Sequence, residues 1–384
     1  MKRRRDRTGR PRRIEVCGID LAGFTRNGLL FSQRRRCTAS FEPILWGGVA
    51  GSFNGRTAAF EAVNLGSNPS PAAIRMNLID LEHGRTRAVI APDAGGRLLQ
   101  LAIRDGERWI DLLHAPADPC DALRDPLVWS SYPMAPWPGR IDGARFTWRG
   151  RLYELEANLG AHAIHGTTFD RPWTVEAVSR GSCRIAIALD ERWPFGGRAV
   201  QLFDLRDDGI DQRIEIHATR APFPAGAGWH ARFRRDVRAG HDVRLLVDAT
   251  HFYETVDMIP TGWLKPALRE HDLRRGGPLG YRRVDACYRA PAAPLHIIWG
   301  DIELTMEQSP NAGHAVVYTP PEDVCLEPQT CAPDAFNLAA QGIDGVGVAV
   351  VEPGRPLVAE TRWRWRVQPS SANRGRKTGA AAVP

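Results

Sequence analysis

The stretch that decides the fold is Arg362-Trp363-Arg364-Trp365-Arg366-Val367, near the end of the sequence. Aromatic and charged residues alternate in it, so an extended chain would be apolar on one face and charged on the other. Half-buried antiparallel strands have this period of two. The same alternation recurs at Arg184-Ile-Ala-Ile-Ala-Leu189, Gln212-Arg-Ile-Glu-Ile-His-Ala218 and Val243-Arg-Leu-Leu-Val-Asp-Ala249.

Strand-like runs dominate residues 76–366, and turn residues separate them. This region has no long amphipathic helical window and no evident internal repeat. The 384 residues are enough for one large all-β domain, and the 37 glycines and 29 prolines suit many turns. We therefore predict an all-β fold, a large antiparallel β-sandwich closed by Greek-key-like connections.

The two ends of the chain differ from this region in composition. Residues 1–75 are rich in arginine and then in Gly, Ser, Asn and Pro, and they show no sustained period. We predict that they form a basic extension, either disordered or not part of the native protein. Residues 367–384 are rich in Ser, Ala, Arg and Gly, which predicts a disordered tail. The predicted folded domain is thus 76–366.

The charge of the chain is concentrated at its ends. Residues 1–75 carry a balance of +9 and residues 367–384 carry +3, so a total of +7 leaves −5 for the predicted domain. An acidic domain argues against a nucleic-acid partner. Seven scattered cysteines without a CxxC pair, no signal peptide and no long apolar run predict reduced thiols, a cytoplasmic protein and no membrane contact.

The candidate functional residues are polar side chains in apolar surroundings. Glu327 lies in Val324-Cys-Leu-Glu-Pro-Gln-Thr330, where burying a carboxylate is costly unless its charge is used or paired. His165, His230 and Asp285 have similar settings, and Arg140 adds a cation. Neither a nucleotide-binding motif nor a metal motif accompanies them. An acid, a base and hydrogen-bonding groups for a polyol point to acid–base chemistry on a sugar.

Several motifs, in order along residues 76–366, resemble the aldose 1-epimerase (galactose mutarotase) family. Taken together they are far more specific than any one of them alone. They are Pro136-Trp-Pro-Gly-Arg140, Ile164-His-Gly-Thr-Thr168, Phe223 to Phe233, Ile259-Pro-Thr-Gly262, Val284-Asp-Ala-Cys-Tyr288 and Val324 to Thr330.

The resemblance implies a function and a role for each residue. It implies a galactose mutarotase-like supersandwich that interconverts the α and β anomers of a free aldohexose by opening and reclosing the ring. Glu327 would be the general base and His230 the general acid. His165 would bond the sugar near the reacting centre, while Arg140 and Asp285 would hold hydroxyls. The expected partner is a small sugar, and neither a cofactor nor a metal is expected. Whether the protein is a monomer or a homodimer stays open.

Two alternatives remain open at this point. A hexose-6-phosphate 1-epimerase would need cations at the rim, which Arg232, Arg234 or Arg235 would supply. A non-catalytic carbohydrate-binding sandwich would not need Glu327 or His230.

The HxxH spacing of His162 and His165 also suits zinc, but without a third ligand nearby we expect no metal there.

Three positions depart from the family's usual pattern and bear on which sugar fits. Gly139 stands where an asparagine is usual, Arg232 where an aromatic residue is frequent, and Val316 where some members have glutamine.

Overall fold

The computed structural model describes residues 76–368. The predictions for residues 1–75 and for the tail beyond Gln368 lie outside this range and stay predictions. The last strand, β25 (Leu357–Val367), includes one residue that the predicted boundary assigned to the tail.

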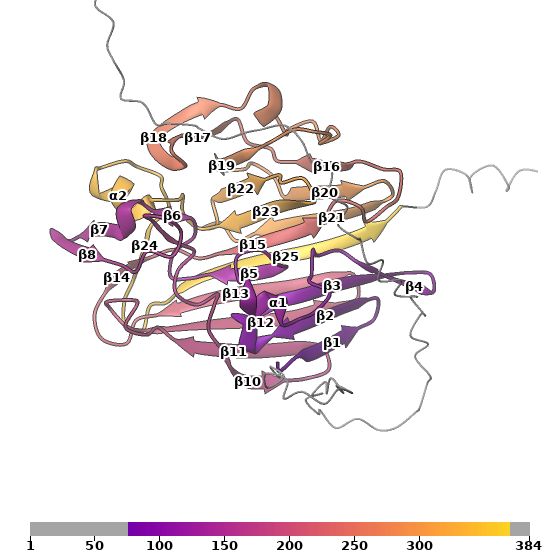
Figure 1. Cartoon of the computed structure of the whole chain (residues 1–384), viewed down its shortest axis with the longest axis horizontal. Helices are drawn as coiled ribbons and strands as arrows, with labels where there is room; N and C mark the ends of the chain where they lie inside the picture. Colours follow the sequence, from indigo (N-terminus) through magenta and orange to yellow (C-terminus); the bar gives the residue numbers. More distant parts are fainter. Residues whose placement is uncertain (1–75, 369–384) are drawn as a thin grey trace, which may run out of the picture. The chain divides into compact units, whose positions relative to one another are not determined.

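Two large antiparallel sheets form the frame of this region (Figure 1). The larger sheet has eleven strands, in the order β1 (Ile79–His83), β2 (Thr86–Ala91), β3 (Arg97–Asp105), β5 (Ser131–Met134), β15 (Gly228–Arg234), β23 (Asp323–Gln329), β22 (His314–Tyr318), β19 (Asp285–Arg289), β17 (His251–Val256) and β18 (Ile259–Pro266), with β4 (Arg108–Asp111) beside β3. The smaller sheet has eight, in the order β10 (Thr174–Val178), β11 (Ser182–Ala188), β12 (Arg198–Arg206), β13 (Gly209–His217), β25, β21 (Ile302–Gln308), β20 (Leu295–Trp299) and β16 (Val243–Leu246). The predicted all-β sandwich is confirmed.

Short elements complete the described region. Three two-stranded ribbons pair β6 (Arg140–Ile141) with β9 (Ala163–Ile164), β7 (Arg145–Trp148) with β8 (Arg151–Glu154), and β14 (Phe223–Ala225) with β24 (Ala349–Val351). The α-helices are α1 (Asp121–Arg124) and α2 (Ala335–Ala340). Within residues 76–368, neither helix has the length and apolar character needed to cross a membrane.

The core lies between the two sheets and follows from the alternation in sequence. Trp363 and Trp365 of β25 are buried, and the arginines that alternate with them point away from the core. Trp363 meets Phe233 of the larger sheet, with ring centroids 5.4 Å apart. The indole Nε1 of Trp365 donates a hydrogen bond to Thr86 Oγ1 of the larger sheet at 2.9 Å. One apolar cluster therefore contains side chains from both sheets.

The same alternation places polar side chains on the outer face of the larger sheet. In β15, Trp229, Ala231 and Phe233 belong to the core cluster. Because successive side chains of a strand point to opposite faces, His230 and Arg232 are directed away from the core. This outer face carries the candidate site.

Removing the central tryptophan should unfold the sandwich more easily. We expect Trp363→Ala to lower the free energy of unfolding by about 3–5 kcal/mol, because it leaves a cavity between the sheets. Trp263, whose side chain is 74% exposed, is a matched control, and Trp263→Ala should change the free energy by less than about 0.5 kcal/mol. Urea unfolding measures both, and equal losses in the two variants would contradict this account of the core.

Candidate active site

The site is built by one row of residues that crosses the middle of the larger sheet. The antiparallel registers Gly228↔Gln329 and Arg232↔Cys325 place His230 of β15 directly opposite Glu327 of β23. Directly opposite residues on neighbouring strands lie on the same face with close Cβ atoms. In full, the row runs Tyr132, His230, Glu327, Val316 and Cys287.

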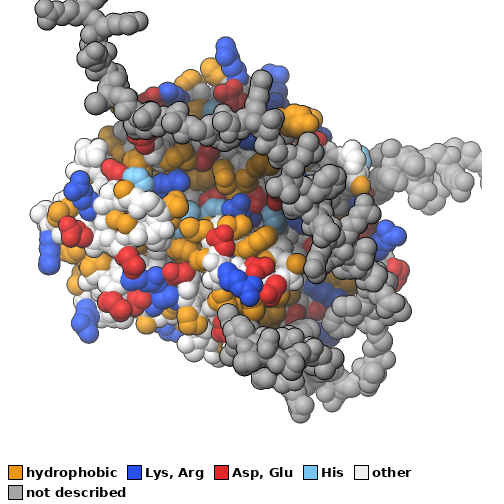
Figure 2. All heavy atoms as spheres, in the orientation of Figure 1, with side chains coloured by type: hydrophobic (Ala, Val, Ile, Leu, Met, Phe, Trp, Pro, Cys, Tyr) orange, Lys and Arg blue, Asp and Glu red, His pale blue; other side chains and the backbone are white. Residues whose placement is uncertain are grey.

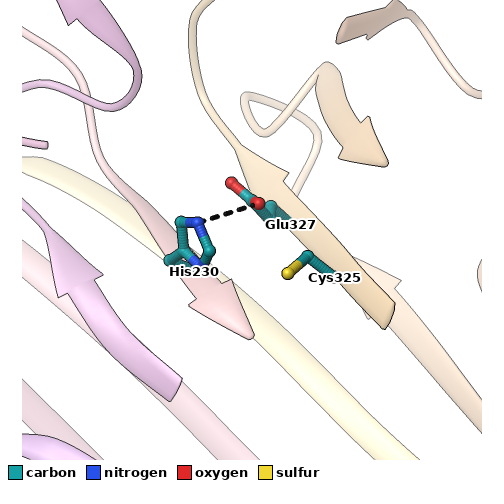
Figure 3. Close-up of side chains that lie close together, drawn as sticks. All are labelled: His230, Cys325 and Glu327. Atoms are coloured by element: carbon teal, nitrogen blue, oxygen red, sulfur yellow. Dashed lines mark ion pairs between the residues drawn. The ribbon is translucent and has the colours of Figure 1, made fainter. Parts of the chain in front are cut away.

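His230 and Glu327 form a buried pair (Figure 3). His230 Nε2 lies 3.2 Å from Glu327 Oε1, and the residues are only 7% and 2% exposed. The ring of Tyr132 stacks on His230 with centroids 4.7 Å apart, so the imidazole is held in place from the other side. A carboxylate and an imidazole at this distance can exchange a proton directly.

Burial shifts the pKa of both members of the pair toward their neutral forms. Desolvation, with the charge of Asp285, raises the pKa of Glu327 well above its usual range, although Arg232 and Arg140 oppose the shift. Desolvation, with His165 and Arg232, lowers the pKa of His230 well below its usual range. The pair as a whole is therefore most stable with one proton and no net charge.

The departure at Val316 helps to explain the raised pKa of Glu327. Val316 lies directly opposite Glu327 on β22 and packs with the buried Tyr253 and Cys287. An apolar side chain offers no donor to stabilise a carboxylate. The apolar side chain of Val316 on this side of Glu327 therefore favours the protonated form of the carboxyl group.

A ribbon brings two further candidates together. Pairing of β6 with β9 aligns Arg140 with Ile164, next to His165. Gly139 and His165 bond twice: the His165 backbone N–H donates to Gly139 O at 3.0 Å, and the Gly139 N–H donates to His165 Nδ1 at 3.2 Å. His165 Nε2 is therefore the nitrogen that carries the proton. Burial and the charge of Arg140 lower the pKa of His165 to about 3, so its ring is neutral.

The departure at Gly139 has a backbone explanation. Its φ of +69° lies in the left-handed region, which glycine adopts freely and asparagine tolerates better than most residues. A Cβ here would come within 2.6 Å of the Pro333 side chain. Glycine thus permits the close approach of Pro333, while keeping the conformation that places Arg140.

Arg140 and Asp285 carry the charges at the edge of the site. Asp285 of β19 is open to solvent, yet the surrounding protein raises its pKa by desolvation, with Arg140 opposing. Within residues 76–368, the Arg140 guanidinium has no hydrogen-bond or ion-pair partner. A half-buried cation of this kind is available to bind a ligand. Figure 2 shows histidine, arginine and carboxylate side chains gathered in a recess on this face.

Arg232, the third departure, is already neutralised by its neighbour. Its guanidinium makes two contacts with Asp323, Nε to Oδ2 at 3.0 Å and Nη2 to Oδ1 at 3.4 Å. Asp323 also accepts from His114 Nδ1 at 2.8 Å. Although burial opposes it, the carboxylate of Asp323 raises the pKa of Arg232, so the guanidinium stays charged. The ion pair fixes Arg232 beside the site as a structural cation.

The structure thus brings all five predicted residues to one region and adds others. Tyr132 was missed, since no motif marks it. Cys325 was not singled out either, yet it shares the outer face with Glu327 because it lies two residues earlier in the same strand. Period two alone would have revealed that. The HxxH residues do not meet as ligands: His162 Nδ1 lies 3.3 Å from Asp142 Oδ1.

A large antiparallel β-sandwich with a buried imidazole–carboxylate pair on the outer face of one sheet defines a class, the mutarotase-like sugar epimerases. The sequence model of one family in that class, described as Aldose 1-epimerase, matches residues 77–364. The chain belongs to the aldose 1-epimerase family, which confirms the resemblance seen in its motifs.

The chain is also similar to individual proteins. The uncharacterized protein YphB of Escherichia coli K12 is 24% identical over 261 residues, which are 61% of this chain and 83% of that protein. The GalM/aldose epimerase homologue from C. elegans superposes with a TM-score of 0.68 at 18% identity, over 77% of this chain and all of that one. Galactose 1-epimerase from Lactobacillus acidophilus NCFM gives 0.64 at 14% identity, over 82% and 99%. These two structures share the fold.

The Arg232–Asp323 pair should be important for stability. We expect Asp323→Ala to lower the free energy of unfolding by about 3–5 kcal/mol, because Asp323 is 2% exposed and its loss strands a buried guanidinium. The double variant Arg232→Met/Asp323→Leu should lose less than Asp323→Ala, since neither charge is left unpaired.

The exposed pair of Arg85 and Asp207 is the control for this experiment. Asp207→Ala should leave the urea midpoint nearly unchanged, because solvent screens an exposed pair. An Asp323→Ala variant as stable as the Asp207→Ala variant would show that the buried network does not hold this part of the sheet.

Proposed function

We propose that this protein is an aldose 1-epimerase that interconverts the α and β anomers of a free aldohexose. The observation that carries the proposal is the buried contact of 3.2 Å between His230 Nε2 and Glu327 Oε1. Mutarotation needs one group to take a proton from the anomeric hydroxyl and another to give one to the ring oxygen. A pair that holds one proton in total meets both needs.

In the proposed reaction, the sugar lies with C1 over the pair. The proton of the pair first passes from Glu327 to His230 across their 3.2 Å contact. Glu327 then takes the proton from O1 while His230 donates its proton to ring oxygen O5, and the C1–O5 bond breaks as the C1–O1 double bond forms. The open-chain aldehyde rotates about C1–C2 and recloses through the reverse transfers. Both residues then regain their starting protonation. No oxidation state changes, so the described side chains are sufficient for the chemistry.

The remaining candidates would hold the sugar in that orientation. The unpartnered Arg140 guanidinium and the Asp285 carboxylate can donate to and accept from neighbouring hydroxyls, which fixes a polyol more strictly than either group alone. Neutral His165 presents its Nε2–H near the pair, since its ring centroid lies 5.0 Å from that of His230. Its donated hydrogen bond would stabilise charge that develops on the sugar oxygen.

The phosphorylated alternative has weaker support. Of the three arginines that were expected to bind a phosphate, Arg232 pairs with Asp323 and Arg234 with Asp236. Arg235 donates to the carbonyl oxygens of Pro320 and Gly280. A phosphate would have to break these contacts. We therefore place a free aldose first and keep hexose-6-phosphate epimerisation as the second candidate.

A purely sugar-binding role would not require the acid–base pair. A hollow of about 540 Å³ lies away from the pair, beside Trp193 and Asp190. Trp193 is fully buried, and Asp190 already pairs with Arg171 and Arg192. Glu191, Thr219 and Arg220 also line this hollow, but no histidine does, so it offers no imidazole–carboxylate pair.

The substrate is tested by following anomer equilibration of freshly dissolved α-glucose, α-galactose and glucose 6-phosphate by polarimetry. We expect the protein to accelerate at least one free aldose more than the phosphate. A strong preference for glucose 6-phosphate would replace the first candidate with the second, and no acceleration of any sugar would contradict both.

Removing either proton-transfer group should abolish most of the activity. We expect Glu327→Gln and His230→Asn each to lower kcat by about 10²–10⁴-fold without unfolding the protein. The matched control is another histidine–carboxylate pair, His217 and Glu215 in the smaller sheet, whose atoms lie 2.8 Å apart. His217→Asn and Glu215→Gln should leave kcat unchanged. If the doubly substituted site variant still equilibrates anomers at the wild-type rate, the assignment is wrong.

The pH profile should be a broad bell. In water, a glutamate and a histidine would hold one proton in total only between about pH 4.3 and pH 6.5. Because the pKa of His230 is lowered and that of Glu327 is raised, the singly protonated pair persists further in both directions. The acid limb, where the pair gains a second proton, should therefore lie lower, and the alkaline limb, where it loses its only proton, should lie higher.

Both limbs belong to the pair, whereas the sequence alone suggests Glu327 for the acid limb and His230 for the alkaline one. The groups around the pair are Tyr132, His165, Arg97, Arg140, Arg232, Cys325 and Asp285. Steady-state rates across pH measure the profile. Rates that rise continuously to high pH would exclude a required acid.

A further inference from the structure

The outer face of the larger sheet holds one reactive group that the proposed proton transfers leave unused, the thiol of Cys325. One ligand atom each from His230, Cys325 and Glu327 lies within 4.8 Å of the others (Figure 3). All three residues are buried, and Cys325 is 0% exposed. Within residues 76–368 this is the one group of His, Cys, Asp and Glu side chains clustered in this way.

The strand register accounts for the cluster. Cys325 and Glu327 are two residues apart in β23, so their side chains share a face. His230 is opposite Glu327 and therefore diagonal to Cys325, a separation that side chains can bridge. The backbone of two neighbouring strands thus presents a nitrogen, a sulfur and an oxygen to one point.

We propose that His230, Cys325 and Glu327 bind a divalent cation of the zinc class, which stops proton transfer by occupying the pair. The inhibitory consequence rests on the proposed function, whereas the binding of the cation does not. The site would be regulatory, since the proposed mutarotation uses the metal-free pair.

The ligand set suits zinc in type and in spacing. Zinc takes imidazole nitrogen, thiolate sulfur and carboxylate oxygen, and three such protein ligands leave a fourth position for water. Bonds of about 2.0–2.3 Å in a tetrahedron place ligand atoms about 3.3–3.6 Å apart. The 3.2 Å contact of His230 with Glu327 already has this spacing. The Cys325 sulfur lies within 4.8 Å of the other two ligand atoms. Rotation of its side chain would have to shorten these distances by little more than about 1 Å.

His230 has ring nitrogens that a metal can use. Its Nε2 faces Glu327, and its buried Nδ1 has no hydrogen-bond partner among the described residues. The nitrogen that would bind the metal is Nε2, and Nδ1 would then carry the proton of the neutral ring. Neither nitrogen is engaged with a backbone donor, unlike Nδ1 of His165.

Charge balance also favours a dication at this point. Binding releases the thiol proton of Cys325 and the proton shared by His230 and Glu327, so the dication, thiolate and carboxylate form a neutral unit. Arg232 and Arg140 repel a cation, but Asp323 pairs with Arg232, and Asp285 lies near Glu327. A thiolate ligand selects zinc, cobalt or cadmium over magnesium and calcium.

The binding test compares metal-stripped wild type with Cys325→Ala and with Cys183→Ala, a control that removes a buried thiol from the smaller sheet. Each protein is titrated with Co²⁺, which gives a charge-transfer absorption when a thiolate binds it, and with Zn²⁺ against a chromophoric chelator. We expect wild type and Cys183→Ala each to bind one equivalent of metal ion. Cys325→Ala should bind that ion at least about tenfold more weakly. The cysteines other than Cys183 and Cys325 are present in all three proteins. The difference in metal affinity between the proteins therefore shows whether Cys325 is a ligand.

Two further results complete the test. Zn²⁺, but not Mg²⁺, should inhibit anomer equilibration by wild type and Cys183→Ala, a chelator should restore it, and Cys325→Ala should stay active. Equal Zn²⁺ affinity and equal Co²⁺ spectra in all three proteins would overturn the metal site. Binding that depends on Cys325 without inhibition would overturn the switch. If metal-free wild type equilibrates no sugar, the proposed function fails, while the Co²⁺ spectra still decide the site.

Discussion

The antiparallel register of β15 against β23 is the constraint on which the candidate site depends. It places His230 opposite Glu327, and the core holds it there, since Trp229, Phe233 and Leu326 pack between the sheets. A slip of either strand by one residue would turn its polar side chains into the core and its apolar ones outward. The packing that stabilises the sandwich is thus the same packing that aligns the two proton-transfer groups.

Burial then sets the chemistry of the pair. Tyr132 covers His230 on one side and Val316 faces Glu327 on the other, so neither group is well solvated. In such surroundings, a net charge on the pair is costly, and a single shared proton is favoured. Arg232 sits close by but its charge is balanced by Asp323, so it does not fix Glu327 as a permanent anion. The pair can therefore give a proton on one side of a sugar and take one on the other.

Much of this could be predicted from local sequence. The alternation in Arg362 to Val367 indicates a half-buried strand, and that strand is β25, the centre of the smaller sheet. Glu327 stands out as a carboxylate in an apolar run. The position of Cys325 beside it follows from period two. These features depend only on neighbouring residues, which is why the sequence reveals them.

Other features depend on contacts between distant segments and have no local signature. Arg232 and Asp323 are 91 residues apart, so nothing near Arg232 announces its partner. Arg140 reaches His165 only through the pairing of β6 with β9. Tyr132 stacks on His230 because β5 happens to be the neighbour of β15 on the side away from β23. The register between strands, which the sequence leaves open, decides all three.

The most direct test of the central claim is a crystal structure of the metal-free protein with a bound aldose. The account predicts that the anomeric carbon lies over the pair, with Glu327 and His230 each within hydrogen-bond distance, about 2.6–3.2 Å, of O1 or O5. Arg140 and Asp285 should contact hydroxyls further along the ring. A sugar bound with its reducing end away from His230 and Glu327, or on another face of the sandwich, would contradict it.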